Sequence, residues 1–129
     1  MSRHEHLLLD GPDGKLEVFI DPPQAAGAEP HGNAAGIALV AHPHPLFGGT
    51  AENKVAQTLA KTLLGLGYAA LRPNFRGVGQ SAGGHDEGEG ETEDMLAVLD
   101  WARGRYGNLP VVLAGFSFGA YVQTKVAAR

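Results

Sequence analysis

The sequence predicts an α/β fold with a mostly parallel sheet, an N-terminal hairpin and helices on both faces of the sheet. Three apolar runs carry this prediction, at residues 37–41, 68–72 and 111–114. Continuous apolar runs of this length are typical of strands that are buried on both faces. Helix-like segments alternate with the runs, and such alternation favours parallel strands joined by right-handed helical crossovers.

The N-terminal third of the sequence predicts two antiparallel strands and a long loop. The strands are expected at residues 6–10 and 15–21, on either side of the turn Gly11-Pro12-Asp13-Gly14. Glycine and proline between two such runs indicate a hairpin. Residues 21–36 are rich in proline, glycine and alanine, and this composition is typical of a loop.

Helices are expected at residues 53–66, 91–106 and 120–128. Apolar residues at helical spacing predict which side of the first helix faces the core. This side is expected to consist of Val55, Leu59, Leu63 and Leu66. The acidic run at residues 86–94 is expected to be a solvated loop and the start of the second helix, where the helix dipole favours negative charge.

Composition limits the classes of protein to which the chain can belong. Its 129 residues predict one domain, and a formal net charge of −4 argues against nucleic acid or an anionic membrane surface as a partner. The absence of cysteine excludes disulfides and thiolate chemistry. No apolar run approaches the roughly 20 residues of a membrane span. A cytoplasmic location is therefore expected.

The candidate functional residues follow the three apolar runs. Carboxyl ends of parallel strands meet at one edge of a sheet, where ligands bind in folds of this class. Two of the loops begin at His42 and Asn74, and the third segment is Gly115-Phe116-Ser117-Phe118-Gly119. A Gly-x-Ser-x-Gly between a strand and a helix predicts a nucleophile elbow. The two glycines lack bulk, which lets strand and helix approach closely.

Three motifs together resemble the small bacterial α/β-hydrolases with an HPHP loop. They are HPHPLFGGT at residues 42–50, NFRGVGQS at 74–81 and GFSFGA at 115–120. The resemblance implies a serine hydrolase, an esterase or acyl hydrolase, with a small-molecule acyl substrate and no cofactor. It also implies the α/β-hydrolase fold, of which this chain is expected to be the N-terminal part only.

The resemblance also implies roles for individual residues. Ser117 is expected to attack the acyl carbonyl, and the amide of Phe118 is expected to be one donor of the oxyanion hole. The second donor is expected to be the amide of His44 or that of Leu46, because Pro43 and Pro45 have no N–H. His44 is favoured, because His42-Pro43 resembles the His-Gly that precedes the donor in related hydrolases. The residues expected to shape the site are His42, Asn74, Arg76, Gly115 and Gly119. Arg76 is expected to pair with backbone or with an acid.

The remaining members of a catalytic triad are expected to lie outside this chain. In α/β-hydrolases the order is Ser, then Asp or Glu, then His, and few residues follow Ser117. We therefore expect residues 1–129 to be a single truncated domain that is inactive alone and is poorly soluble or self-associating. The alternative is a non-catalytic binding module or an inactive fragment.

Two other interpretations are weaker. His42 and His44, completed by His85 and Asp86, are a possible metal site, although three separate loops would have to converge. The run at residues 77–82, GVGQSA, fits a dinucleotide fingerprint, but that motif requires a helix to open at once and glycines follow instead. We expect no metal and no nucleotide cofactor.

Overall fold

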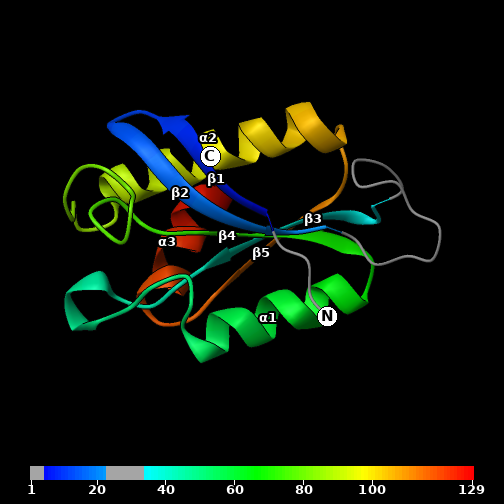
Figure 1. Cartoon of the computed structure of the whole chain (residues 1–129), viewed down its shortest axis with the longest axis horizontal. Helices are drawn as coiled ribbons and strands as arrows, with labels where there is room; N and C mark the ends of the chain where they lie inside the picture. The colour runs from blue at the N-terminus through cyan, green and yellow to red at the C-terminus, as the bar shows by residue number, and fades with distance from the viewer. Residues whose placement is uncertain (1–4, 23–33) are drawn as a thin grey trace.

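The computed structural model describes residues 5–22 and 34–129. It shows a five-stranded mixed sheet with helices on both faces (Figure 1). The strands are β1 (Glu5–Gly11), β2 (Gly14–Asp21), β3 (Gly36–Ala41), β4 (Tyr68–Pro73) and β5 (Val111–Gly115). The helices are α1 (Lys54–Gly65), α2 (Glu89–Tyr106), α3 (Phe118–Ala127) and the short 3-10 helix η1 (Pro45–Phe47). Most of the loop expected at residues 21–36 lies outside the described residues.

The strands lie in the order β1-β2-β4-β3-β5. β3 pairs in parallel with both β4 and β5, so that Leu39 is level with Leu71 on one side and with Leu113 on the other. β1 and β2 form an antiparallel hairpin, and β2 also pairs antiparallel with β4. The expected hairpin and the three expected parallel strands are confirmed.

Each face of the sheet is covered by a different set of helices. α1 packs against one face, while α2 and α3 pack against the other, and Figure 1 shows α1 and α2 on opposite sides of the strands. Alternation along β3 separates the two cores, since Ala38 and Val40 face α1 whereas Ile37 and Leu39 belong to the other cluster. In the described part of the chain, no helix is long and apolar enough to cross a membrane.

The predicted apolar face of α1 is wrong by about one residue. Val55 is 39% exposed and Leu66 65% exposed, while Leu59 and Leu63 are only partly buried. The fully covered positions are Ala56, Ala60 and Leu64. Alanines allow the helix to lie close to the small residues of β3 and β4, and a pattern based on large side chains does not detect such a face.

Candidate active site

Ser117 lies in a strained turn between β5 and α3. Its backbone has φ 58° and ψ −120°, in the left-handed region that favours glycine, and a conformation of this kind costs about 1–3 kcal/mol. The side chain is exposed and makes no capping hydrogen bond to α3. The hydroxyl is therefore accessible at the amino end of a helix.

The two flanking glycines are required by close contacts. A Cβ at Gly115 would lie 2.7 Å from the backbone nitrogen of Ala120, and a Cβ at Gly119 would overlap the carbonyl oxygens of Ala41 and His42. Contacts below 3 Å are not possible for real Cβ atoms, so larger residues would displace the turn. Gly119 thus brings the start of α3 against the end of β3, which places Ser117 beside the loop that begins at His42.

His42 is buried and neutral. Its Nε2 accepts a hydrogen bond from the amide of Phe75 at 3.0 Å, which leaves Nδ1 as the protonated nitrogen, at 2.7 Å from the carbonyl oxygen of Pro43. Burial lowers the pKa of His42 to about 4. Both ring nitrogens are engaged with backbone, so the side chain holds two loops together and is not available as a base or as a metal ligand.

The amides of His44 and Leu46 differ in their partners. The amide of Leu46 donates to Nδ1 of His44 at 3.1 Å, where His44 caps η1. Among the described residues, the backbone N–H groups of His44 and Phe118 have no hydrogen-bond acceptor. Two backbone donors without partners therefore lie on the two loops that carry the site: that of Phe118 follows the serine in the turn after β5, and that of His44 lies in the loop after β3.

Asn74 links its loop to two other segments. Its Oδ1 accepts from the amide of Ala51 at 2.8 Å, and its Nδ2 donates to Oε1 of Glu17 at 2.7 Å. Glu17 is buried in β2. Burial alone would raise the pKa of this carboxyl, but hydrogen bonds from the Gln80 amide, His6 and Asn74 outweigh it, and the net pKa is lowered. Asn74 thus positions the loop after β4 and makes no contact with Ser117 among these hydrogen bonds.

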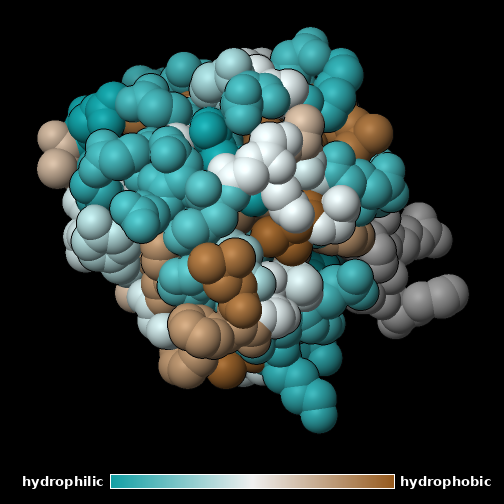
Figure 2. Space-filling model, turned by 90° about the vertical axis from the view of Figure 1, so that its left-hand side faces the viewer, coloured by the Kyte–Doolittle hydropathy of each residue, from teal (hydrophilic) through white to brown (hydrophobic). Residues whose placement is uncertain are grey.

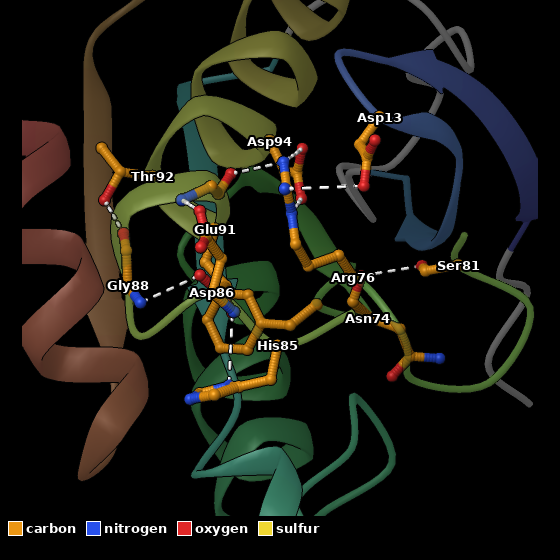
Figure 3. A network of polar contacts seen from close by, with 12 residues as sticks. Asp13, Asn74, Arg76, Ser81, His85, Asp86, Gly88, Glu91, Thr92 and Asp94 are labelled. Carbon is orange, nitrogen blue, oxygen red and sulfur yellow. Dashed lines mark hydrogen bonds and ion pairs between the residues drawn. The ribbon is translucent and has the colours of Figure 1, made fainter. Parts of the chain in front are cut away.

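Arg76 makes the expected contacts to backbone and to an acid. Its Nε and Nη2 donate to the two carboxylate oxygens of Asp94 at 2.7 and 2.8 Å, and Nη2 also donates to the carbonyl oxygen of Gly90 at 3.0 Å. Asp94, by this hydrogen bonding, raises the pKa of the guanidinium further. Figure 3 shows Arg76 between Asp94 and Asp13. The loop after β4 is thereby anchored to α2.

The acidic run is only partly the solvated segment that the sequence predicts: α2 begins within it and Asp86, Glu87, Glu89 and Glu93 are exposed, but two of its acids are buried. Glu91 is fully buried and Asp94 is 3% exposed. Glu91 accepts from the amides of Asp86 and Gly88 at 2.8 and 2.9 Å, as Figure 3 shows, and closes the first turn of α2. Buried carboxylates persist where hydrogen bonds or opposite charges satisfy them, and here backbone amides and Arg76 do so. Periodicity alone gives no signal for such pairing.

Aromatic contacts join the three loops, so their expected convergence is confirmed. The ring of Phe118, after β5, lies 4.7 Å from that of His44, after β3, and 5.4 Å from that of Phe75, after β4. The ring of His85 lies 4.7 Å from that of His44. Three ends of parallel strands therefore share one aromatic cluster. Of its members, His85 had been considered from the sequence only for a metal site.

The end of the molecule that carries these loops has an apolar area. Figure 2 shows hydrophobic side chains gathered on part of this face, next to a larger hydrophilic area. Leu46 is 69% exposed, Phe47 is 88% exposed and Phe116, next to Ser117, is 47% exposed. Among the described residues, no three His, Asp or Glu are grouped so that they could hold a metal ion.

Comparisons with known proteins place the fold among the α/β-hydrolases. Residues 15–129 match the family model described as X-Pro dipeptidyl-peptidase (S15 family). A solved alpha-beta serine hydrolase homologue from Coxiella burnetii has 48% identity and a TM-score of 0.87, and the match covers 95% of this chain and 56% of that one. A lidless α/β serine hydrolase from Xanthomonas campestris has 43% identity and a TM-score of 0.88, over 98% of this chain and 56% of that one.

A sequence relative is also matched over only about half of its length. An uncharacterised protein of Rickettsia prowazekii is 41% identical over 124 residues, which make up 95% of this chain and 49% of that protein. This chain therefore spans about half the length of the relatives that it matches.

Proposed function

The chain belongs to the X-Pro dipeptidyl-peptidase (S15) family, and from this premise we propose that it supplies the nucleophile and the oxyanion hole of a serine hydrolase that acts on acyl substrates. The single observation that carries the proposal is the strained, exposed Ser117, followed by an amide without a partner at Phe118, whose ring lies 4.7 Å from that of His44, the residue with the second unpartnered amide. Strain of this kind is concentrated at active sites, where it fixes the direction of a reacting group.

In the proposed reaction, Ser117 Oγ attacks the carbonyl carbon of an ester and forms a tetrahedral intermediate. Loss of the alcohol gives an acyl-enzyme, and water then releases the acid and restores the serine. The amides of Phe118 and His44 would hold the negative oxygen of the intermediate. His44 is favoured over Leu46, because the Leu46 amide already donates to the imidazole of His44.

The general base and its acid partner are proposed to come from segments beyond residue 129. The order Ser, acid, His of α/β-hydrolases supports this, as does the span of this chain, about half the length of its relatives. His42 is not a substitute, since both its nitrogens bond to backbone. Residues 1–129 alone would keep the oxyanion hole but only a small residual rate.

The substrate is proposed to be an ester with an apolar acyl or aryl group. The exposed Leu46, Phe47 and Phe116 support this, because they provide apolar surface beside the serine. The family description names X-Pro dipeptidyl peptidases, and peptide hydrolysis would use the same acyl-enzyme chemistry. Parallel assays on p-nitrophenyl esters of increasing chain length and on an Xaa-Pro-p-nitroanilide decide between the two substrate classes.

The test of the nucleophile is covalent labelling. The full-length gene product should react with a fluorophosphonate probe, and Ser117→Ala should abolish both labelling and ester hydrolysis. Thr58→Ala is the matched control, because it removes an exposed hydroxyl from α1 and should leave labelling intact. Labelling that persists in Ser117→Ala would overturn the proposal, as would a wild-type protein that hydrolyses none of the substrates.

A further inference from the structure

We propose that His85 is a positioning residue for the oxyanion hole, with its ring packed against both His44 and Phe118 and its Nδ1 beside the carboxylate of Glu91. The inference rests on the proposed function, because the amides of His44 and Phe118 are the two proposed donors. His85 belongs to neither loop that carries these donors. It comes from the segment between β4 and α2.

The three rings close a triangle. The centroid of the His85 ring lies 4.7 Å from that of His44 and 5.3 Å from that of Phe118, and the His44 and Phe118 centroids are themselves 4.7 Å apart. Each ring follows a different strand: His44 comes after β3, His85 after β4 and Phe118 after β5. Offset and tilted ring pairs at these distances are favourable, so His85 braces the two donor-bearing residues against each other.

The carboxylate of Glu91 lies close to the imidazole of His85. Its Oε2 lies 3.3 Å from Nδ1 of His85, and its carboxylate is itself held by the amides of Asp86 and Gly88. Among the described residues, Nδ1 of His85 is buried and has no hydrogen-bond partner. The carboxylate is the polar group that it approaches. The ring of His85 therefore lies between the aromatic cluster and a carboxylate that backbone amides hold at the start of α2.

The position of this ring matters because an oxyanion hole tolerates little displacement. Its donors must lie about 2.7–3.1 Å from the oxygen that becomes negative. Removal of the His85 ring would leave a void beside both donor residues, and either loop could relax into it. We therefore expect His85 to affect stabilisation of the transition state more than binding of the substrate.

The experiment measures kinetics of the full-length protein per active serine, with sites counted by fluorophosphonate titration. His85→Ala should lower kcat about tenfold and leave KM nearly unchanged. It should weaken a trifluoromethyl ketone inhibitor, which forms a tetrahedral adduct with the serine, by a similar factor. His85→Phe keeps the ring and loses only the contact with Glu91, and it should recover most of the loss.

His6→Ala is the matched control. His6 also pairs with a buried carboxylate, that of Glu17 at 2.5 Å, and stacks on an aromatic ring, that of Phe19 at 4.9 Å, but it lies in β1. This variant should keep the kcat of the wild type. If His85→Ala yields no titratable sites, His85→Phe should still show a higher kcat than His85→Gln, which has no ring.

The outcomes separate the two proposals. Failure of the wild-type protein to label at Ser117 would sink the proposed function. Normal labelling, with kcat and inhibitor affinity of His85→Ala within twofold of the wild type, would refute the role of His85 alone. So would a rise in KM at constant kcat, since that would make His85 a substrate contact, and so would equal kcat values for His85→Phe and His85→Gln.

Discussion

The backbone amide of Phe75 donates to Nε2 of His42 at 3.0 Å, and this bond ties the loop after β4 to the loop after β3. The imidazole that accepts it is fully buried and packs at 4.5 Å against the Phe75 ring. This hydrogen bond links two loops of the candidate site. It forms only while the ring is neutral, because protonation of Nε2 would remove the acceptor.

Stability should therefore fall as the pH is lowered from about 6.5 to about 4. The pKa of His42 is lowered to about 4 in the folded protein, so in this range the unfolded chain takes up a proton that the folded chain does not. At about pH 4, His42 should have lowered the free energy of unfolding by roughly 3 kcal/mol relative to pH 6.5. Urea unfolding of the wild type and of His42→Asn at several pH values checks this.

The informative quantity is the difference between the two pH profiles. His42→Asn has no group that titrates at this position, so its stability should decline less between pH 6.5 and pH 4. Parallel profiles for both proteins would show that His42 does not titrate as expected.

A second expectation concerns the ion pair between Arg76 and Asp94. Both side chains are buried, with 10% and 4% exposed, and Arg76→Ala would leave a carboxylate without its bidentate partner. Loss of one member of such a buried pair costs about 3–5 kcal/mol. Arg129→Ala provides the comparison, since it breaks the half-exposed pair with Glu93 and should cost less than about 1 kcal/mol. Chemical denaturation of both variants measures the contrast.

Gly119→Ala should disrupt the turn at Ser117. The Cβ of the new alanine would overlap the carbonyl oxygen of Ala41, and backbone moves aside less easily than a side chain. We therefore expect the free energy of unfolding to fall by about 1–3 kcal/mol and fluorophosphonate labelling to be lost. Gly65→Ala adds the same atom at the end of α1, where nothing lies within 4 Å of the new Cβ. That variant should unfold no earlier than the wild type, and equal effects of the two substitutions would refute the steric argument.

The backbone strain at Ser117 should lower the free energy of unfolding by a measurable amount. Ser117→Gly removes the left-handed strain at φ 58°, whereas Ser117→Ala keeps it, so the glycine variant should be the more stable of the two by about 1 kcal/mol. At Thr58, in the middle of α1, the order should reverse, because glycine is about 1 kcal/mol worse than alanine in a helix. Thermal unfolding of the four variants tests the sign at each position.

The sequence determined the order and type of the elements, because these depend on local patterns. The apolar runs that became β3, β4 and β5, and the turn that became the β1–β2 hairpin, are short stretches whose neighbours in the chain decide their conformation. The convergence of three loops followed from topology, since carboxyl ends of parallel strands meet at one edge. The narrow face of α1 was missed because Ala56 and Ala60 pack as well as larger residues where the sheet offers Ala38 and Ala70.

Only the tertiary structure decided which charged side chains are buried and what they hold. Glu17, Glu91 and Asp94 are polar in any sequence pattern, and each is buried because partners from other segments satisfy it: Asn74 and Gln80, the amides of Asp86 and Gly88, and Arg76. The same holds for the partner of the Leu46 amide: resemblance already favoured His44 over Leu46 as the second donor, and the hydrogen bond from the Leu46 amide to the His44 imidazole, which no spacing predicts, now supports that preference. Burial of apolar side chains follows the hydrophobic periodicity of a segment. Burial of a charged side chain requires a particular partner, and such partners come together only when the chain has folded.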